Sequence, residues 1–260
     1  MKKLPAPLLA LLFTTASVAT ASVAVASVAV AGRPETPAVP ATVAATATER
    51  QTREVAPFTA VNAAGSMNVI VRQGSPQRVE VEASAADQAK VETEVEGGRL
   101  RVGRRREGRE MWKIEKFNGP VFVYVTVPSL TAVSVSGSGD LRVEGPVQAG
   151  DFQVSVAGSG NLFLPQLTAQ TLKTGLAGSG NISLGGTCPR HSIGVAGSGN
   201  VRADNLRTDD TEVRISGSGS VQVNAAKTLN SRISGSGDVL LRGAAQISTS
   251  KSGSGSVRRL

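Results

Sequence analysis

The sequence predicts an all-β protein, a single-stranded parallel β-helix (a β-solenoid) with about 18–21 residues in each rung. The main observation is a motif, Gly-Ser-Gly followed by Asp, Asn or Ser, that occurs seven times. Short self-similar segments at a nearly constant period are typical of folds in which similar units stack on one another. The motif begins at Gly137, Gly158, Gly178, Gly197, Gly217, Gly235 and Gly253.

The second observation is an alternation of apolar residues with polar or small ones on both sides of the motif. In the second repeat, Val156 precedes the motif, and Leu162 and Leu164 follow it. A period of two is typical of strands with one buried face, and glycine suits a tight corner because it tolerates positive φ. Each repeat is therefore interpreted as strand, glycine corner and strand. We expect Gly180 to have a positive φ, so that Gly180→Val would destabilise the fold.

Stacking explains how such short repeats can fold. About twenty residues cannot bury an apolar face alone, but rungs stacked at roughly 4.8 Å bury a continuous core. A β-propeller, the alternative, would need about 40 residues for each blade. The Ser, Asn and Asp side chains at the corners are expected to form polar ladders along one edge. In the last repeat, Lys251 and Arg259 replace apolar residues, which would limit further stacking.

The N-terminus indicates export. Lys2 and Lys3 precede an uncharged run with several small-residue cleavage sites, so residues 1–31 are interpreted as a signal peptide. An uncleaved membrane anchor is the alternative, because the run exceeds the roughly 20 residues that span a bilayer. Residues 32–53 are rich in Pro, Ala and Thr and are interpreted as a linker. We therefore expect an exported protein that is periplasmic, outer-membrane-associated or extracellular.

The remaining residues, 54–260, are expected to form one β-helix domain. Residues 54–130 carry less regular strand patterns and are interpreted as irregular N-terminal rungs. Within them, the segment Gly65-Ser66-Met67-Asn68 resembles an eroded copy of the corner motif. Residues 131–260 contain the seven Gly-Ser-Gly repeats.

Four segments carry a resemblance to a known family. They read FTAV from Phe58, NVIVRQG from Asn68, VTVPSL from Val125 and VSGSGDL from Val135. In these segments, and across residues 54–260, the sequence resembles the family called putative auto-transporter adhesin, head GIN domain. The resemblance implies a secreted bacterial β-helix with an adhesin role and, on the same ground, a right-handed winding. It implies no site residues.

The densest positive charge follows the segment 99–103, and we interpret it as a candidate binding site for an anionic ligand. Guanidinium groups suit carboxylate, sulfate and phosphate groups, and an aromatic side chain adds a platform. A solvated loop is the alternative, because runs of charge usually mark solvated segments. The candidate binding residues are Arg104, Arg105, Arg106 and Trp112.

The net charge of the chain also indicates which classes of binding partner to consider. The formal net charge of +8 permits attraction to an anionic glycan or a cell-envelope polymer. The other partner that we consider is a second copy of the chain, through self-association by stacking. We expect neither a nucleic acid nor a small-molecule cofactor to be bound by an exported protein of this composition.

The sequence offers no recognisable catalytic pattern. It contains neither a Gly-x-Ser-x-Gly elbow nor a dinucleotide-binding glycine pattern. Cys188 and His191 provide two metal ligands where three or four are needed, so no metal site is predicted. We therefore expect a non-enzymatic envelope or surface protein with an adhesin-like binding or scaffolding role. The alternative is a β-helix carbohydrate-active enzyme, of lyase or hydrolase type, with a site assembled from separate rungs.

Overall fold

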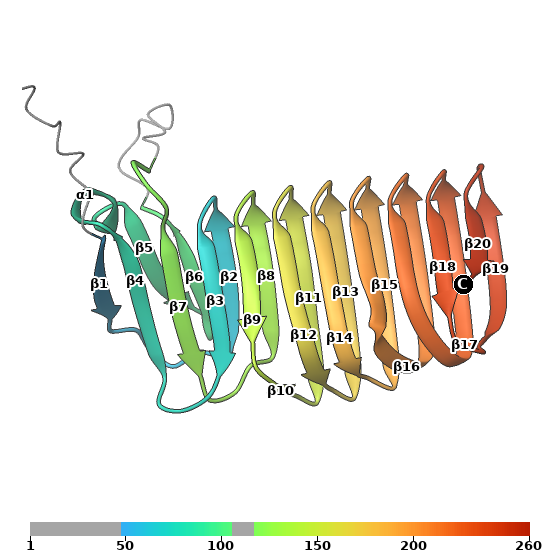
Figure 1. Cartoon of the computed structure of the whole chain (residues 1–260), viewed down its shortest axis with the longest axis horizontal. Helices are drawn as coiled ribbons and strands as arrows, with labels where there is room; N and C mark the ends of the chain where they lie inside the picture. Colours follow the sequence, from blue (N-terminus) through green and yellow to red (C-terminus); the bar gives the residue numbers. More distant parts are fainter. Residues whose placement is uncertain (1–47, 106–116) are drawn as a thin grey trace, which may run out of the picture. The chain divides into compact units, whose positions relative to one another are not determined.

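The computed structural model describes residues 48–105 and 117–260, and these residues form a parallel β-solenoid (Figure 1). The predicted fold class is confirmed, and the right-handed winding stays a prediction. Each repeat contributes one strand before its glycine corner and one after it, so the strands form two facing sheets. We call these the pre-corner sheet and the post-corner sheet. Within the described ranges, no helix is long and apolar enough to cross a membrane.

The pre-corner sheet begins with an antiparallel pair and continues with parallel strands. Its last members include the C-terminal parts of β16 and β17, because these two long strands bend from one sheet into the other. In spatial order the strands are β5 (Val91–Glu96), β6 (Arg99–Arg104), β2 (Ala60–Gly65), β8 (Ala132–Gly137), β11 (Asp151–Gly158), β13 (Thr171–Gly178), β15 (Arg190–Gly197), β16 (Asn200–Gly217), β17 (Ser220–Gly235) and β19 (Gln246–Ser252).

The post-corner sheet has the matching order, with the N-terminal parts of β16 and β17 between β14 and β18. A short strand, β10 (Val147–Gln148), pairs with the end of β12, and the four-residue helix α1 (Ala85–Gln88) connects β4 to β5. The other strands are β1 (Thr48–Arg53), β4 (Arg78–Ser84), β7 (Phe122–Val127), β3 (Asn68–Gln73), β9 (Asp140–Glu144), β12 (Asn161–Thr168), β14 (Asn181–Thr187), β18 (Asp238–Arg242) and β20 (Ser256–Arg259).

The strands stack in register, so equivalent residues of successive repeats lie side by side. Leu141, Leu162 and Ile182 form one such inward-facing row, and each is at most 1% exposed. The apolar positions of the alternating pattern therefore meet between the two sheets and form one continuous core. This arrangement is the physical reason for the repeat, because each rung buries its apolar face against its neighbours.

The two glycines of each corner have different roles. Gly178, the first glycine of its motif, has a φ of 121°, which a residue with a side chain adopts only with strain. Gly180, the second, does not have a positive φ, so the expectation for its backbone was wrong. Its constraint is steric instead, because a Cβ atom on Gly180 would lie 2.2 Å from the carbonyl oxygen of Gly160 in the preceding rung.

The expected polar ladder runs beside the corners and is confirmed. Asn161 donates a hydrogen bond from Nδ2 to Oδ1 of Asp140 (2.9 Å), and Asn181 donates one to Oδ1 of Asn161 (2.9 Å). Asn200 continues the ladder to Asn181 at 3.2 Å. These side chains therefore link rung to rung along one edge of the solenoid.

The N-terminal rungs do not follow chain order. Strands β2 and β3 lie between the pair β6–β7 and the pair β8–β9. The chain thus forms the inner rung, β2–β3, before the outer rung, β6–β7. The segment β4, α1 and β5 connects the two. At the edges of the two sheets, β1 pairs with β4 and β5 pairs with β6, both in antiparallel fashion.

The C-terminal bound of the predicted linker, residues 32–53, was wrong. Residues 48–53 form β1, which pairs with β4 along its full length, because β4 presents an open sheet edge to them. Arg50 also places its guanidinium 4.3 Å from the centre of the Tyr124 ring. The predicted signal peptide (1–31) and the rest of the predicted linker lie outside the described residues.

Polar residues occupy inward positions in the last rung. Lys251 pairs in register with the buried Ile233, and its ammonium group lies 3.5 Å from the carbonyl oxygen of Gly255. Arg259 donates to the carbonyl oxygen of Ala245 at 2.7 Å. These two side chains replace the apolar contacts that a further rung would need at these positions.

Candidate binding groove

The outer face of the pre-corner sheet carries a groove of about 1130 Å³. Most of its lining residues come from six neighbouring strands, namely β6, β2, β8, β11, β13 and β15, and Glu96 at the end of β5 adds to them. At the usual spacing of about 4.8 Å between strands, six strands span roughly 24 Å. The groove is therefore long enough for an extended polymer.

The groove exists because small side chains face outward between long ones. Arg99 pairs in register with Ala60, Ala60 with Ala132, and the row continues through Gln153 to Lys173. Because Ala60 and Ala132 have only methyl side chains, the surface is hollowed in the middle of the row. Arg99 and Lys173 stand at the two ends of the row, roughly 19 Å apart at the usual strand spacing.

Basic residues outnumber acidic ones in this groove. Arg101 pairs with Glu92 at 3.3 Å, and Asp151 accepts a hydrogen bond from the hydroxyl group of Thr171. Within the described part of the chain, the other three basic residues make no ion pair. The charged lining residues are Arg99, Arg101, Lys173 and Arg190, together with Glu96 and Asp151. The groove is therefore positively charged and solvent-exposed, a combination that attracts anionic polymers.

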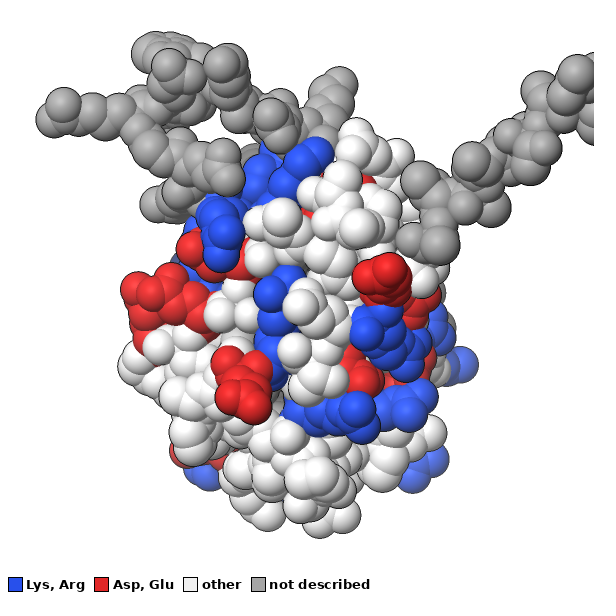
Figure 2. All heavy atoms as spheres, turned by 90° about the vertical axis from the view of Figure 1, so that its left-hand side faces the viewer, with Lys and Arg blue, Asp and Glu red and all other residues white. Residues whose placement is uncertain are grey.

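The structure describes two of the four predicted binding residues, Arg104 and Arg105, and these two do not come together. Arg106 and Trp112 lie outside the described residues. Arg104 and Arg105 are neighbours at the end of β6, and neighbouring side chains of an extended chain point to opposite sides. The Arg104 guanidinium lies 4.6 Å from the centre of the Phe117 ring. Arg105 is exposed and lines a hollow beside β1 and α1, at the end of the solenoid where basic and acidic side chains lie close together (Figure 2).

Lys173 and Arg190 are the groove residues that sequence reasoning missed. Each is an isolated basic residue within its repeat, so neither belongs to a dense run of charge. The repeat register could have found them. They lie five and seven residues before Gly178 and Gly197, and both positions have the outward phase of the strand.

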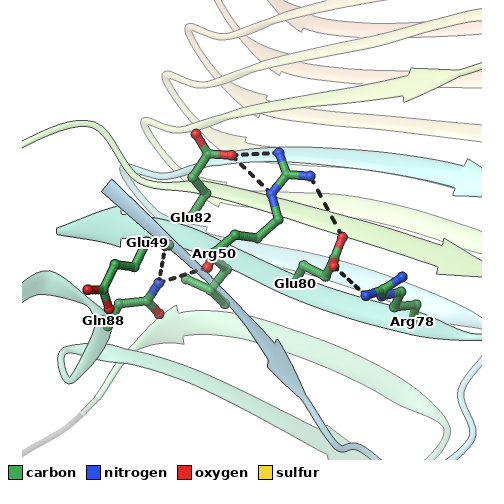
Figure 3. Close-up of polar contacts among 7 residues, drawn as sticks. Glu49, Arg50, Arg78, Glu80, Glu82 and Gln88 are labelled. Atoms are coloured by element: carbon green, nitrogen blue, oxygen red, sulfur yellow. Dashed lines mark hydrogen bonds and ion pairs between the residues drawn. The ribbon is translucent and has the colours of Figure 1, made fainter. Parts of the chain in front are cut away.

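Glu80 and Glu82, near the N-terminal end, are engaged in ion pairs. Figure 3 shows Arg50 between Glu82 and Glu80, with nitrogen–oxygen distances of 2.6 and 4.0 Å. Glu80 also pairs with Arg78 at 2.9 Å. These contacts connect β1 to β4 and leave neither carboxylate unpaired. In the described ranges, no group of three or more His, Cys, Asp or Glu side chains is placed to hold a metal ion.

His191 and Cys188 face the interior. Nε2 of His191 lies 2.9 Å from the hydroxyl oxygen of Thr174, and Nδ1 has no partner among the described residues. Burial lowers the pKa of His191 to about 3. The Cys188 thiol donates to the carbonyl oxygen of Arg190 at 3.1 Å, and burial raises its pKa. The corner serines, such as Ser179, are exposed at the edge instead, so the imidazole and these hydroxyl groups lie apart.

Solved structures share this architecture. A putative adhesin from Bacteroides fragilis has a TM-score of 0.75 and 24% sequence identity. The match covers 82% of this chain and 97% of the adhesin chain. A protein from Parabacteroides distasonis, described as a putative lipid binding protein, has a TM-score of 0.67 and 25% identity, covering 82% and 96%. A putative adhesin from Parabacteroides merdae gives 0.67 and 19%, with the same coverage.

The family comparison agrees with these structures. No curated protein is significantly similar to the chain. The family described as putative auto-transporter adhesin, head GIN domain, matches residues 57–245, most of the described solenoid. The resemblance found in the sequence is confirmed, and the chain belongs to this family.

Proposed function

We propose that this chain is a non-enzymatic, exported surface protein that binds an anionic glycan or cell-envelope polymer along its pre-corner sheet. The observation that carries the proposal is the groove across six strands, with Arg99, Arg101, Lys173 and Arg190 in its lining. Guanidinium and ammonium groups spaced along a polar groove match the regularly spaced carboxylate or sulfate groups of such a polymer. The adhesin descriptions of the family and of two solved relatives support a binding role.

The first experiment measures polymer binding and its salt dependence. The purified protein is titrated with an anionic polysaccharide and with a neutral one of similar length, at low and at moderate ionic strength. We expect binding to the anionic polymer alone, weakening as salt is added because the contacts are solvent-exposed charges. The double variant Lys173→Gln/Arg190→Gln is expected to lose at least about tenfold in affinity, since each lost charge-assisted contact costs roughly 1.5 kcal/mol or more.

The matched control removes two charges elsewhere. Arg202→Gln/Arg207→Gln changes exposed arginines that do not line the groove, so its affinity should stay within about twofold of wild type. Equal losses in both double variants would mean that net charge alone drives binding, which contradicts a groove site. Binding to anionic lipid vesicles in place of the polysaccharide would instead favour the lipid-binding description of one relative.

The enzyme alternative is tested in the same preparation. A β-helix lyase or hydrolase would shorten the polymer during incubation, and chromatography of the polymer would detect the fragments. Cleavage that disappears in His191→Ala or in a groove variant would overturn the non-enzymatic proposal. An unchanged polymer length with saturable binding is the expected result.

Export carries its own prediction. Expression of the whole chain in a Gram-negative host is expected to yield a periplasmic or surface product that begins between Ser22 and Gly32. Intact mass spectrometry of the purified protein locates the new N-terminus. Protein with Met1 still present in the membrane fraction would support the uncleaved anchor.

A further inference from the structure

The corners of the solenoid contain a repeated hydrogen-bond device. The backbone N–H groups of Ser138 and Gly139 both donate to the carbonyl oxygen of Gly65, at 2.9 and 2.8 Å. The same pair of bonds joins the next corners, for example from Ser159 and Gly160 to Gly137 at 2.9 and 3.0 Å. The corners that begin at Gly137 to Gly235 thus each present two converging N–H donors to a single carbonyl oxygen of the preceding rung, and at the last corner Gly255 donates to Gly235.

The first corner has the donors without the acceptor. Gly65, Ser66 and Met67 occupy the positions of Gly137, Ser138 and Gly139 in the register. The rung beyond them is β6–β7, whose strands are joined by a longer connection than a Gly-Ser-Gly corner. Among the described residues, nothing accepts a hydrogen bond from the N–H groups of Ser66 and Met67, although Met67 is only 2% exposed.

Two further observations show that, among the described residues, no glycine corner is packed against this one. A Cβ atom on Gly137 would lie 2.5 Å from the carbonyl oxygen of Gly65, whereas a Cβ atom on Gly65 would meet nothing within 4 Å. Met67 replaces the second glycine, which the other corners need because a preceding rung leaves no room for a side chain. The eroded motif in the sequence therefore marks the corner against which no described Gly-Ser-Gly corner packs.

A basic side chain lies beside the open corner. Ser66 and Arg104 line the same cavity of about 740 Å³, together with the ring of Phe117 and the corner residue Ser138. The guanidinium of Arg104 stacks on Phe117, and its Nε atom is buried without a hydrogen-bond partner in the part of the chain that the structure describes. Among the described residues, no acidic side chain lines this cavity. Within the described ranges, the backbone N–H group of Ser66 and the guanidinium of Arg104 are therefore unsatisfied donors in the lining, and the N–H group of Met67 is an unsatisfied donor next to them.

We propose that this corner is a binding site for a carboxylate group. One carboxylate oxygen takes the place that a glycine carbonyl oxygen has at every later corner, and accepts from the N–H groups of Ser66 and Met67. The second oxygen accepts from Arg104, whose charge neutralises the ligand. A planar carboxylate suits the site because the oxygen that it replaces is itself an sp² oxygen. The cavity shares no lining residue with the pre-corner groove, so this site is separate from the proposed polymer site.

The carboxylate of Asp87 is hydrogen-bonded to the lining residue Gly119, and its own donors already satisfy it. Asp87 is fully buried and accepts hydrogen bonds from the backbone N–H groups of Asn118 and Gly119. Ser84 and Lys90 also donate to its carboxylate. Desolvation acts to raise the pKa of Asp87, but these hydrogen bonds outweigh it and the pKa is lowered. The charge of Asp87 is therefore taken up by its own donors.

The test follows the two amide groups directly. Nuclear magnetic resonance spectra of the ¹⁵N-labelled protein are recorded during titration with acetate, with glucuronate, with sulfate and with uncharged glucose. Acetate and glucuronate are expected to shift the Ser66 and Met67 amide protons downfield in a saturable manner, and glucose is expected to leave them unchanged. A response to sulfate equal to that of acetate would show a general oxyanion site and overturn the specificity for carboxylate.

Variants separate this site from the rest of the surface. Arg104→Gln is expected to weaken acetate binding at least about tenfold, while Arg202→Gln on the post-corner face leaves it unchanged. Lys173→Gln/Arg190→Gln should also leave the acetate response unchanged, so failure of the polymer groove does not affect this result. The proposal is overturned if acetate does not move the two amide signals in the wild-type protein, or if Arg104→Gln binds acetate as wild type does.

Discussion

Replacing Gly180 with valine is expected to lower the free energy of unfolding by at least about 3 kcal/mol, the upper part of the range for overpacked interiors. The Cβ atom would lie 2.2 Å from the carbonyl oxygen of Gly160 and 2.9 Å from Cγ1 of Val156. The oxygen belongs to a corner that is itself bonded to the rungs on either side. Relief of the contact therefore requires two rungs to separate, which breaks hydrogen bonds on both faces of the corner.

Gly194 provides the matched control. It lies in the middle of β15, where a Cβ atom would meet nothing within 4 Å, and its φ is not positive. Gly194→Val is therefore expected to be neutral or slightly stabilising, because valine suits a strand better than glycine does. Urea unfolding of both variants measures the difference. Equal stabilities of the two variants would contradict the steric role assigned to the second corner glycine.

The regular part of the fold could be predicted because the repeat fixes its own geometry. Once corners such as Gly158 and Gly178 are aligned, strand alternation determines which residues face inward, and the structure has Leu162 and Ile182 in one buried row. The Asn161–Asn181 ladder follows from the same alignment. Because the rungs stack in register, the position of a residue within its repeat determines which residues of the neighbouring rungs it contacts.

The irregular features depended on contacts that no local pattern encodes. Strand β1 exists because β4 presents an open edge to residues 48–53, whose composition resembles a linker. The groove requires small residues of two strands to lie between Arg99 and Lys173, which come from strands more than 70 residues apart in the chain. Arg104 and Arg105 formed one cluster in the sequence, but strand geometry sends them to different cavities.

The second large effect concerns acid stability and the only histidine of the chain. His191 occupies an inward position between Leu172 and Thr211 and is 3% exposed. Burial lowers its pKa from 6.5 to about 3. Between these values the folded protein keeps a neutral imidazole, while the unfolded chain binds a proton. Stability is therefore fully present above pH 6.5 and falls by about 1.4 kcal/mol for each pH unit below it, until about pH 3.

The variant His191→Leu isolates this contribution. Loss of the hydrogen bond to Thr174 changes its stability by an amount that does not depend on pH, and all other titrating groups are shared with the wild type. The difference in free energy of unfolding between wild type and variant is therefore expected to change by about 3 kcal/mol between pH 7.5 and pH 4.5, at the expense of the wild type. Urea unfolding at both pH values measures it, with His191→Gln as a polar second variant. Parallel pH profiles of wild type and both variants would contradict this prediction. They would mean that the folded protein protonates His191 as readily as the unfolded chain does.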